Sequence, residues 1–337
     1  MTRSEWRFWR RPSELRKCGL LGMNRRNLEY LAGCNPRQYY PRVDDKLLTK
    51  QICQAHGIRV PATYAVIERN GDVGRFPSLL DGRREFVIKP AKGAEGRGIL
   101  VVASHDGRRF LTAGGHAMSE TDLRYHLSAI LSGLHSLGGQ TDRAIIEQRV
   151  MRHPAFDKLA VEGTPDIRII VYRGIPAMAM VRLPTVASRG RANLHQGAIA
   201  AGIDLPTGRT FGGVCGGRTV TSHPDTGYAI GGLVVPEWPV LLSSAVELSA
   251  ALGLGYLGVD FVLDADVGPV VLEANARPGL AIQVANRRGL AGRLEQIDAE
   301  LEEQLASPPQ RRTETWPNDR GSAASHRRQR TRSSIGA

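Results

Sequence analysis

The chain has 337 residues, 42% of them hydrophobic and 23% charged, and no apolar run of membrane-spanning length. This composition predicts a globular protein with a buried core, built as one large domain or as two to three smaller ones. The first residues carry paired arginines without an apolar core behind them, which argues against a secretion signal and favours the cytoplasm. Four widely spaced cysteines without a CxxC pair fit reduced thiols in that compartment.

The net charge of +12 is concentrated at the two ends of the sequence. Residues 1–26 hold eight basic and two acidic side chains, and residues 307–337 hold seven and two, so the chain between them is nearly neutral. A neutral body argues against a nucleic-acid-binding fold, although basic ends can contact the phosphates of RNA, DNA or acidic lipid. The last segment has almost no apolar residues, and we expect residues 307–337 to be disordered.

The first predicted elements lead up to residue 67. Residues 24–40 predict a short helix followed by a loop, because glycine and proline interrupt a polar and aromatic stretch. We expect Asp44 to cap a helix over residues 44–56, whose apolar side chains fall on one stripe. A strand is predicted over residues 62–67.

A glycine-rich loop follows. A strand over residues 85–90 contains Lys89 near its end and continues through AKGAEGRG into a strand over residues 99–102. Such a hairpin can fold its backbone N–H groups over phosphates while the lysine supplies a positive charge. The glycines can equally make only a tight turn, and the loop is neither a Walker A loop nor a dinucleotide fingerprint.

The clearest predicted helix covers residues 119–137. Ser119 begins a capping box, and apolar residues as far as Leu134 form the buried stripe. Two histidines of this segment, His126 and His135, have no metal-ligand companions at matching spacing, so we expect them at the surface or in packing.

The second half of the chain predicts mostly strands. Arg168 and Arg182 lie on the two arms of a hairpin, and the glycine-dense residues 207–232 fit loops or a β-ribbon. The predicted elements are a strand over residues 144–150, hairpin arms over 167–173 and 177–183, and helices over 236–252 and 290–305.

The segment GVDFVLDADVGPVVLEANARPG reads as two apolar strands around an Asp/Gly turn. A symmetric hairpin with a loop of residues 264–269 pairs Val270 with Leu263 and places Asp260 opposite Glu273.

Asn275 shares the face of Glu273, since side chains alternate along a strand. Two carboxylates and an amide oxygen would then converge, and such ligands suit Mg²⁺, which leaves its other positions to water and phosphate oxygens. A hairpin whose acids have no metal to bind is the alternative at this point.

Six motifs in this order resemble those of ATP-grasp enzymes: DDKLLTK, FVIKPAKGAEGRGILVV, IIEQRV, DIRIIVYRG, RANLHQG and GVDFVLDADVGPVVLEANARPG. The start NRRNLEYLAGCNPRQYYPRVDDKLLTK more narrowly resembles the alpha-L-glutamate ligase-like proteins, relatives of the ligase that adds glutamate to a ribosomal protein. The resemblance implies an α+β ATP-grasp fold, in which two α+β subdomains clasp a nucleotide. Its parts would be a basic lead-in at 1–43, an N-subdomain at 44–143, a C-subdomain with the metal site at 144–306, and the tail at 307–337.

The resemblance also implies roles for individual residues. Those matched to phosphate binding are Lys46, Lys89 and the lid glycines Gly93, Gly96 and Gly98. The residues matched to the linker whose backbone hydrogen-bonds adenine are Glu147, Gln148, Arg149 and Val150, and Asp157 is matched to the ribose. The metal ligands would be Asp260, Glu273 and Asn275, holding Mg²⁺ with Mn²⁺ as an alternative. Four residues match positions at which related ligases bind the γ-phosphate, the acyl phosphate or the acceptor: Arg168, Arg182, Asn193 and His195.

Residue by residue, each role has an alternative. From the sequence alone, Lys46 is equally well a solvated helix residue, Arg168 a structural ion-pair partner and His195 a loop hydrogen-bonder.

The expected activity is that of an ATP-dependent carboxylate–amine ligase, which makes an acyl phosphate and releases ADP. The expected substrate is a small molecule or peptide with a carboxylate and an acceptor amine, and glutamate is suggested by the family name alone. Two other classes compete with it: an ATP-binding regulator without turnover, and a nucleic-acid-associated protein that uses its basic ends.

Overall fold

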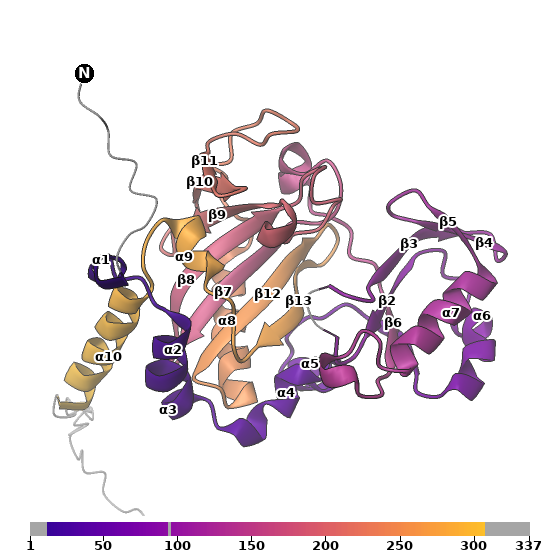
Figure 1. Ribbon diagram of the computed structural model, residues 1–337, viewed down its shortest axis with the longest axis horizontal. Helices are drawn as coiled ribbons and strands as arrows, with labels where there is room; N and C mark the ends of the chain where they lie inside the picture. The colour runs from indigo at the N-terminus through magenta and orange to yellow at the C-terminus, as the bar shows by residue number, and fades with distance from the viewer. Residues whose placement is uncertain (1–11, 94–95, 307–337) are drawn as a thin grey trace, which may run out of the picture.

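In the computed structural model, the described residues are 12–93 and 96–306, so the predicted tail at 307–337 and the start of the basic lead-in lie outside them. Two antiparallel sheets with helices packed on them form two lobes (Figure 1). The smaller sheet has six strands in the order β1-β6-β2-β3-β4-β5, and the larger has seven in the order β11-β10-β9-β8-β7-β12-β13. The predicted α+β class is confirmed.

The smaller sheet packs one face against α6 and α7, around a core that contains Phe76, Phe86 and Phe110. Its strands are β1 (Thr63–Ile67), β2 (Phe86–Pro90), β3 (Leu100–His105), β4 (Arg109–Thr112), β5 (Ala117–Ser119) and β6 (Ala144–Glu147). Its helical segments are η3 (Asn70–Arg75), α6 (Phe76–Leu79), α7 (Glu120–Leu131) and η4 (Leu137–Gly139).

Helix α7 begins as predicted and ends earlier. Ser119 and the N3 residue of the helix form both hydrogen bonds of a capping box. The helix ends at Leu131 rather than at residue 137, and Leu134, predicted to be buried, is 70% exposed. The chain turns at Gly133, which has φ +86°. A Cβ there would lie 2.3 Å from the carbonyl oxygen of Gln140, so the turn requires glycine.

The larger sheet is covered on both faces, which explains its nearly continuous apolar strands. Ile169 faces the core under α8, whereas Ile170 faces the core formed with α9 and α10. The strands are β7 (Asp166–Tyr172), β8 (Ile175–Leu183), β9 (Ile199–Ile203), β10 (Thr210–Cys215), β11 (Arg218–Val220), β12 (Tyr256–Asp264) and β13 (Gly268–Asn275). The helical segments are η5 (Pro154–Leu159), η6 (Leu194–Gln196), α8 (Trp238–Leu252), α9 (Ala281–Asn286) and α10 (Ala291–Ala306). The glycine-dense stretch is thus in part a β-ribbon, β10–β11.

A helical lead-in packs along the larger sheet. The side chain of Asn35 donates to the carbonyls of Tyr256 (2.7 Å) and Ala276 (3.0 Å) and accepts from the backbone N–H of Tyr256 (2.9 Å). The segments are α1 (Pro12–Lys17), α2 (Met23–Arg25), η1 (Arg26–Leu31), α3 (Ala32–Cys34), η2 (Arg37–Tyr39), α4 (Pro41–Asp44) and α5 (Lys46–Ala55). The lead-in therefore supports the ends of β12 and β13.

Helix α5 connects the two lobes (Figure 1). Its N-cap is Asp45, whose side chain accepts from the N–H of Leu47, and not Asp44 as predicted, because Asp44 ends α4. Cys53 of α5 belongs to the core of the larger sheet, and β6 belongs to the smaller one, so the predicted boundary at residue 143 does not follow the sheets.

The four cysteines are unpaired. Over the part of the chain described here, no helix combines the length and the apolar character needed to cross a bilayer.

Candidate functional site

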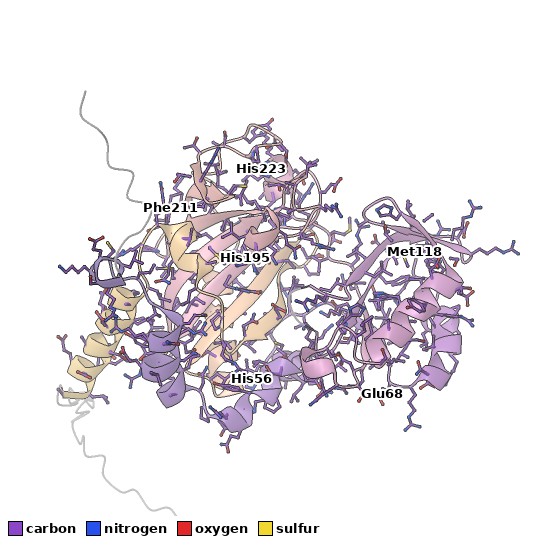
Figure 2. The ribbon with its side chains drawn as sticks, viewed as in Figure 1. His56, Glu68, Met118, His195, Phe211 and His223 are labelled. Carbon is purple, nitrogen blue, oxygen red and sulfur yellow. The ribbon has the colours of Figure 1, made fainter. Side chains whose placement is uncertain are left out.

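Charged residues line one face of the larger sheet. On β7, Ile170 and Tyr172 face the core formed with α10, and the two preceding positions of the same face are Asp166 and Arg168. The strand therefore changes from apolar to charged where the helices no longer cover it. Figure 2 shows this sheet with His195 labelled, opposite the smaller sheet where Met118 is labelled.

The predicted metal residues lie on β12 and β13, in a register that differs from the predicted one. Val270 pairs with Val262 and not with Leu263, because only three residues separate the paired ends of the turn. A β-bulge then adds one residue to β13, so that Asp260 lies opposite Glu273 as predicted. The shorter turn and the β-bulge each shift the register by one residue in opposite directions, so their effects cancel at Asp260.

The carboxylate of Asp260 is buried between two arginines. Arg168 donates Nε to Oδ1 at 2.6 Å and Nη2 to Oδ2 at 2.5 Å, and Arg182 donates Nη2 to Oδ2 at 3.0 Å. Burial alone raises the pKa of Asp260, but the two guanidinium groups outweigh it and hold that pKa below the usual range for a carboxyl. Asp260 is therefore an anion held in a fixed direction.

A second acid continues this network. Asp166 accepts from Nε of Arg182 at 2.5 Å, and burial raises the pKa of Asp166 to about 7, although Arg182 opposes the shift. Each arginine still has N–H groups beyond those in these bonds, since a guanidinium carries five.

Glu273 is far more accessible than Asp260. Its side chain is 36% exposed, and Nδ2 of Asn275 lies 3.3 Å from Oε1 and 3.5 Å from Oδ2 of Asp260. Turning the Asn275 amide over would present its oxygen to the same point, since amide orientation is assigned from the hydrogen-bond network. The donors are thus carboxylate and amide oxygens, which fit Mg²⁺.

This donor set is not a cluster of acids, histidines and thiols. Within residues 12–93 and 96–306, no group of three or more His, Cys, Asp or Glu side chains could hold a metal ion. Any cation here would depend on the amide and on oxygens that a bound substrate brings.

Lys46 joins the two lobes. Its Nζ donates to the carbonyl of Gly93 at 2.5 Å and lies 3.9 Å from Oε2 of Glu273. Burial lowers the pKa of Lys46, and Glu273 partly offsets this. One cation therefore contacts the glycine-rich loop of the smaller sheet and the acidic hairpin of the larger sheet.

Lys89 is buried at the end of β2 and binds an acid. Its Nζ lies 2.6 Å from Oε1 of Glu147, and Nζ of Lys50 lies 2.5 Å from Oε2 of the same carboxylate. Lys50 was missed in the sequence. The signal was its spacing of four residues from Lys46, which places both on one face of α5.

The glycine-rich loop needs its glycines for space at both ends. A Cβ on Gly93 would lie 2.2 Å from Pro90, and one on Gly98 would lie 2.6 Å from the ring of His135. Gly98 also has φ +73°, and its carbonyl lies 3.0 Å from Nε2 of His126. The two histidines of the α7 region therefore pack against the loop.

Asp142 anchors the start of the loop and was also missed. Its oxygens accept from the N–H of Lys92 at 3.0 and 3.1 Å, from Oγ of Ser136 at 2.6 Å and from the N–H of Arg143 at 2.7 Å. Its contact with the loop, at Lys92, is 50 residues away in sequence, and this is why no motif marked Asp142.

The predicted adenine linker runs from β6 toward the larger sheet. Gln148 is tied to Ala62, donating its N–H to the carbonyl at 2.8 Å and accepting from the N–H through Oε1 at 3.2 Å. Nη1 of Arg149 bonds Oε2 of Glu85 at 3.0 Å. The half-buried Val150 ends this segment.

The remaining predicted residues have local partners. Asp157, assigned to the ribose, accepts from Nε of Arg152 at 3.1 Å. Asn193 caps η6 by accepting from the backbone N–H of His195 at 3.0 Å, and His195 is exposed. The structure thus brings together Lys46, Glu273 and the Asp260 network, while Asp157 and Asn193 have structural bonds of their own.

The sequence matches the family described as sugar-transfer associated ATP-grasp over residues 25–299. The chain belongs to this ATP-grasp family. The predicted resemblance is confirmed at this level.

Curated relatives of this ATP-grasp chain carry the description probable alpha-L-glutamate ligase. One from Aeromonas salmonicida (strain A449) is 24% identical over 255 residues, which cover 75% of this chain and 63% of that protein. One from Parasynechococcus marenigrum (strain WH8102) is 24% identical over 277 residues, which cover 79% and 43%. The chain therefore spans less than two thirds of the length of these relatives.

Solved ATP-grasp structures are also similar to it. The D-alanine–D-alanine ligase of Bacillus anthracis complexed with ATP has a TM-score of 0.46 at 15% identity, over 79% of this chain and 69% of that one. The ATP-grasp ligase PsnB with its minimal precursor has a TM-score of 0.43 at 15% identity, over 81% and 65%.

Proposed function

We propose that this ATP-grasp chain is an ATP-dependent ligase that joins a carboxylate to an amine and releases ADP and phosphate. One observation carries the proposal: Nζ of Lys46 lies at 2.5 Å from the Gly93 carbonyl and 3.9 Å from Glu273. A single ammonium group thus lies where the glycine-rich loop meets a set of hard oxygen ligands. That combination suits a magnesium-bound triphosphate.

The residues divide the task by their chemistry. Lys46 and Lys89 bind phosphate oxygens as point charges, and the loop N–H groups cover the phosphates. Glu273 and Asn275, together with Asp260, would hold Mg²⁺, which neutralises phosphate charge and aligns the transferred group. Mn²⁺ offers the same charge with similar ligand preferences.

The reaction proceeds in two steps. A carboxylate oxygen attacks the γ-phosphorus of ATP, the bond to the bridging oxygen breaks, and ADP leaves with that oxygen. The acceptor nitrogen then attacks the carbonyl carbon of the acyl phosphate, phosphate leaves, and the amine gives up a proton. The first step brings two anions together, so positive charge and positioning contribute most of the rate.

Arg168 and Arg182 supply that charge on the side of the larger sheet. Their anchoring to Asp260 and Asp166 fixes the guanidinium planes, and their remaining N–H groups can bind the γ-phosphate or the acyl phosphate. His195 is exposed, where an acceptor can reach it. Asn193 orients the turn that carries His195.

The substrates follow from similarity. The relatives described as probable alpha-L-glutamate ligases support glutamate as one substrate, and the other would be an amine on a small molecule, peptide or protein. The family description, sugar-transfer associated, adds amino sugars to the acceptors to be tested.

The test is an ADP-release screen of the purified protein with Mg²⁺ and ATP, across pools of amino acids, peptides and amino sugars. Mass spectrometry of each positive pool should show a product that is heavier than the acceptor amine by the mass of the acid minus that of one water molecule. ATP binding without ADP release in any pool would contradict the ligase assignment and favour a regulator that binds ATP.

A further inference from the structure

Glu147 lies between two lysines in the interior of the protein. Its residue exposure is 3%, and that of Lys50 and of Lys89 is 5% each. The two carboxylate oxygens are divided between them, with Oε1 2.6 Å from Nζ of Lys89 and Oε2 2.5 Å from Nζ of Lys50. The three side chains come from β6, α5 and β2.

The charge of this group decides what Lys89 can do. With both lysines charged, the group carries one net positive charge. Without Lys50, the carboxylate and Lys89 would form a neutral pair, and a phosphate would have to compete with Glu147 for the ammonium group. Buried charges are weakly screened by salt and solvent, so this difference of one unit charge changes the electrostatic potential around Lys89.

Lys50 differs from Lys89 in its partner atom, since its Nζ is bound to the second oxygen of Glu147. Burial lowers the pKa of Lys50 while Glu147 opposes the shift. Lys50 lies one turn along α5 from Lys46, the residue that contacts the glycine-rich loop. Helix α5 therefore positions Lys46 against the glycine-rich loop and Lys50 against Glu147.

On the basis of the proposed function, we infer that Lys50 is a positioning residue for ATP. By binding one oxygen of Glu147, it offsets the charge of that carboxylate, so the positive charge of Lys89 remains available to the phosphates. Its contribution acts on phosphate charge and not on the adenosine moiety. A lysine that only stabilised the fold would affect both parts of the nucleotide alike.

The experiment is calorimetric titration of ATP, ADP and adenosine, each with Mg²⁺, into the full chain and its variants. Lys50→Met removes the charge and keeps the length of the side chain. We expect ATP to bind at least about tenfold more weakly, which corresponds to about 1.4 kcal/mol. ADP should lose less, and adenosine should bind as it does to the unchanged protein.

The double variant Lys50→Met/Glu147→Gln separates charge from packing. Glu147→Gln keeps the backbone of the predicted adenine linker, and removing the charges of both Lys50 and Glu147 returns the formal charge of the group to +1, so ATP affinity should return to within about threefold of the unchanged protein, a margin below 1 kcal/mol. Lys158→Met, at an exposed position, is the matched control for overall charge and should bind ATP normally. Circular dichroism reports whether each variant is folded.

The outcomes distinguish this inference from the proposed function. If the unchanged protein binds no ATP, the proposed function fails and this inference with it. If it binds ATP and Lys50→Met binds equally well, or loses ATP and adenosine alike, the inference alone is overturned. Should Lys50→Met not fold, the double variant still decides, because weak ATP binding by a folded double variant contradicts the role of charge.

Discussion

Arg168 and Asp260 lie directly opposite each other on β7 and β12 and form a two-point ion pair, with contacts of 2.6 and 2.5 Å. Both side chains are largely buried, at 12% and 3% exposure. The cross-strand register thus fixes a carboxylate and a guanidinium in one plane. The proposed metal ligand Asp260 and the proposed phosphate-binding group of Arg168 are oriented by the same contact.

Replacing Arg168 tests this coupling. In Arg168→Gln the buried carboxylate of Asp260 keeps only Arg182 as an ionic partner, and we expect the free energy of unfolding to fall by about 2–4 kcal/mol. ADP release should fall by a larger factor than this destabilisation explains. Urea unfolding and the ADP assay measure the two effects.

Arg168→Lys is the matched control. It keeps the charge but loses the two-point geometry, since an ammonium group is not a planar fork. It should be more stable than Arg168→Gln and still slow. Full turnover in Arg168→Lys would mean that the plane of the guanidinium is irrelevant to the chemistry.

Glu273→Gln should separate activity from stability. The side chain is 36% exposed and its nearest cation, Lys46, is 3.9 Å away, so we expect the free energy of unfolding to change by no more than about 0.5 kcal/mol. Loss of a metal-binding carboxylate should abolish ADP release or shift it to much higher Mg²⁺. The assay is therefore run as a Mg²⁺ titration, with Glu247→Gln, an exposed site on α8, as control. Unchanged turnover at low Mg²⁺ would refute the metal assignment.

The sequence was most informative where local pattern determines structure. A symmetric hairpin predicted that Asp260 lies opposite Glu273, and this pairing is present because the shorter turn and the β-bulge shift the register by compensating amounts. The capping residue of α7 was also predicted, since a capping box joins Ser119 to Asp122, only three positions later. Both are properties of a short segment.

Backbone turns and long-range contacts decided what the sequence did not show. Helix α7 ends at Leu131 because the chain turns at Gly133, whose φ is +86° and which packs closely on the backbone of Gln140. Lys50 acquires its partner Glu147 only when α5 meets β6, 97 residues away. Two adjacent acids made the choice between Asp44 and Asp45 as N-cap depend on where the preceding helix ends.

Two glycines of the glycine-rich loop have the same φ and different surroundings. Gly96 and Gly98 both have φ +73°, but a Cβ on Gly96 would meet no atom of the described residues within 4 Å, whereas one on Gly98 would meet the ring of His135. Gly96→Ala should therefore cost only the backbone strain, about 1 kcal/mol. Gly98→Ala should cost about 1–2 kcal/mol more, and His135→Ala in the same chain should recover part of it. Equal unfolding free energies for the two alanine variants would contradict the packing of His135 on the loop.

Asp142 offers the sharpest test of how the loop is anchored. Its carboxylate accepts four hydrogen bonds, two of them from the N–H of Lys92, where the loop begins. Asp142→Asn replaces one acceptor oxygen by a donor that faces other donors, so we expect a loss of about 1–3 kcal/mol in unfolding free energy. Because the loop is then less well fixed, the KM for ATP should rise while the KM for the amine stays the same. Ser136→Ala removes one donor and leaves the carboxylate, so it should cost less and leave the KM for ATP near its original value. A KM for ATP that does not move in a folded Asp142→Asn variant would show that the loop is positioned by its other contacts, such as Lys46 on Gly93.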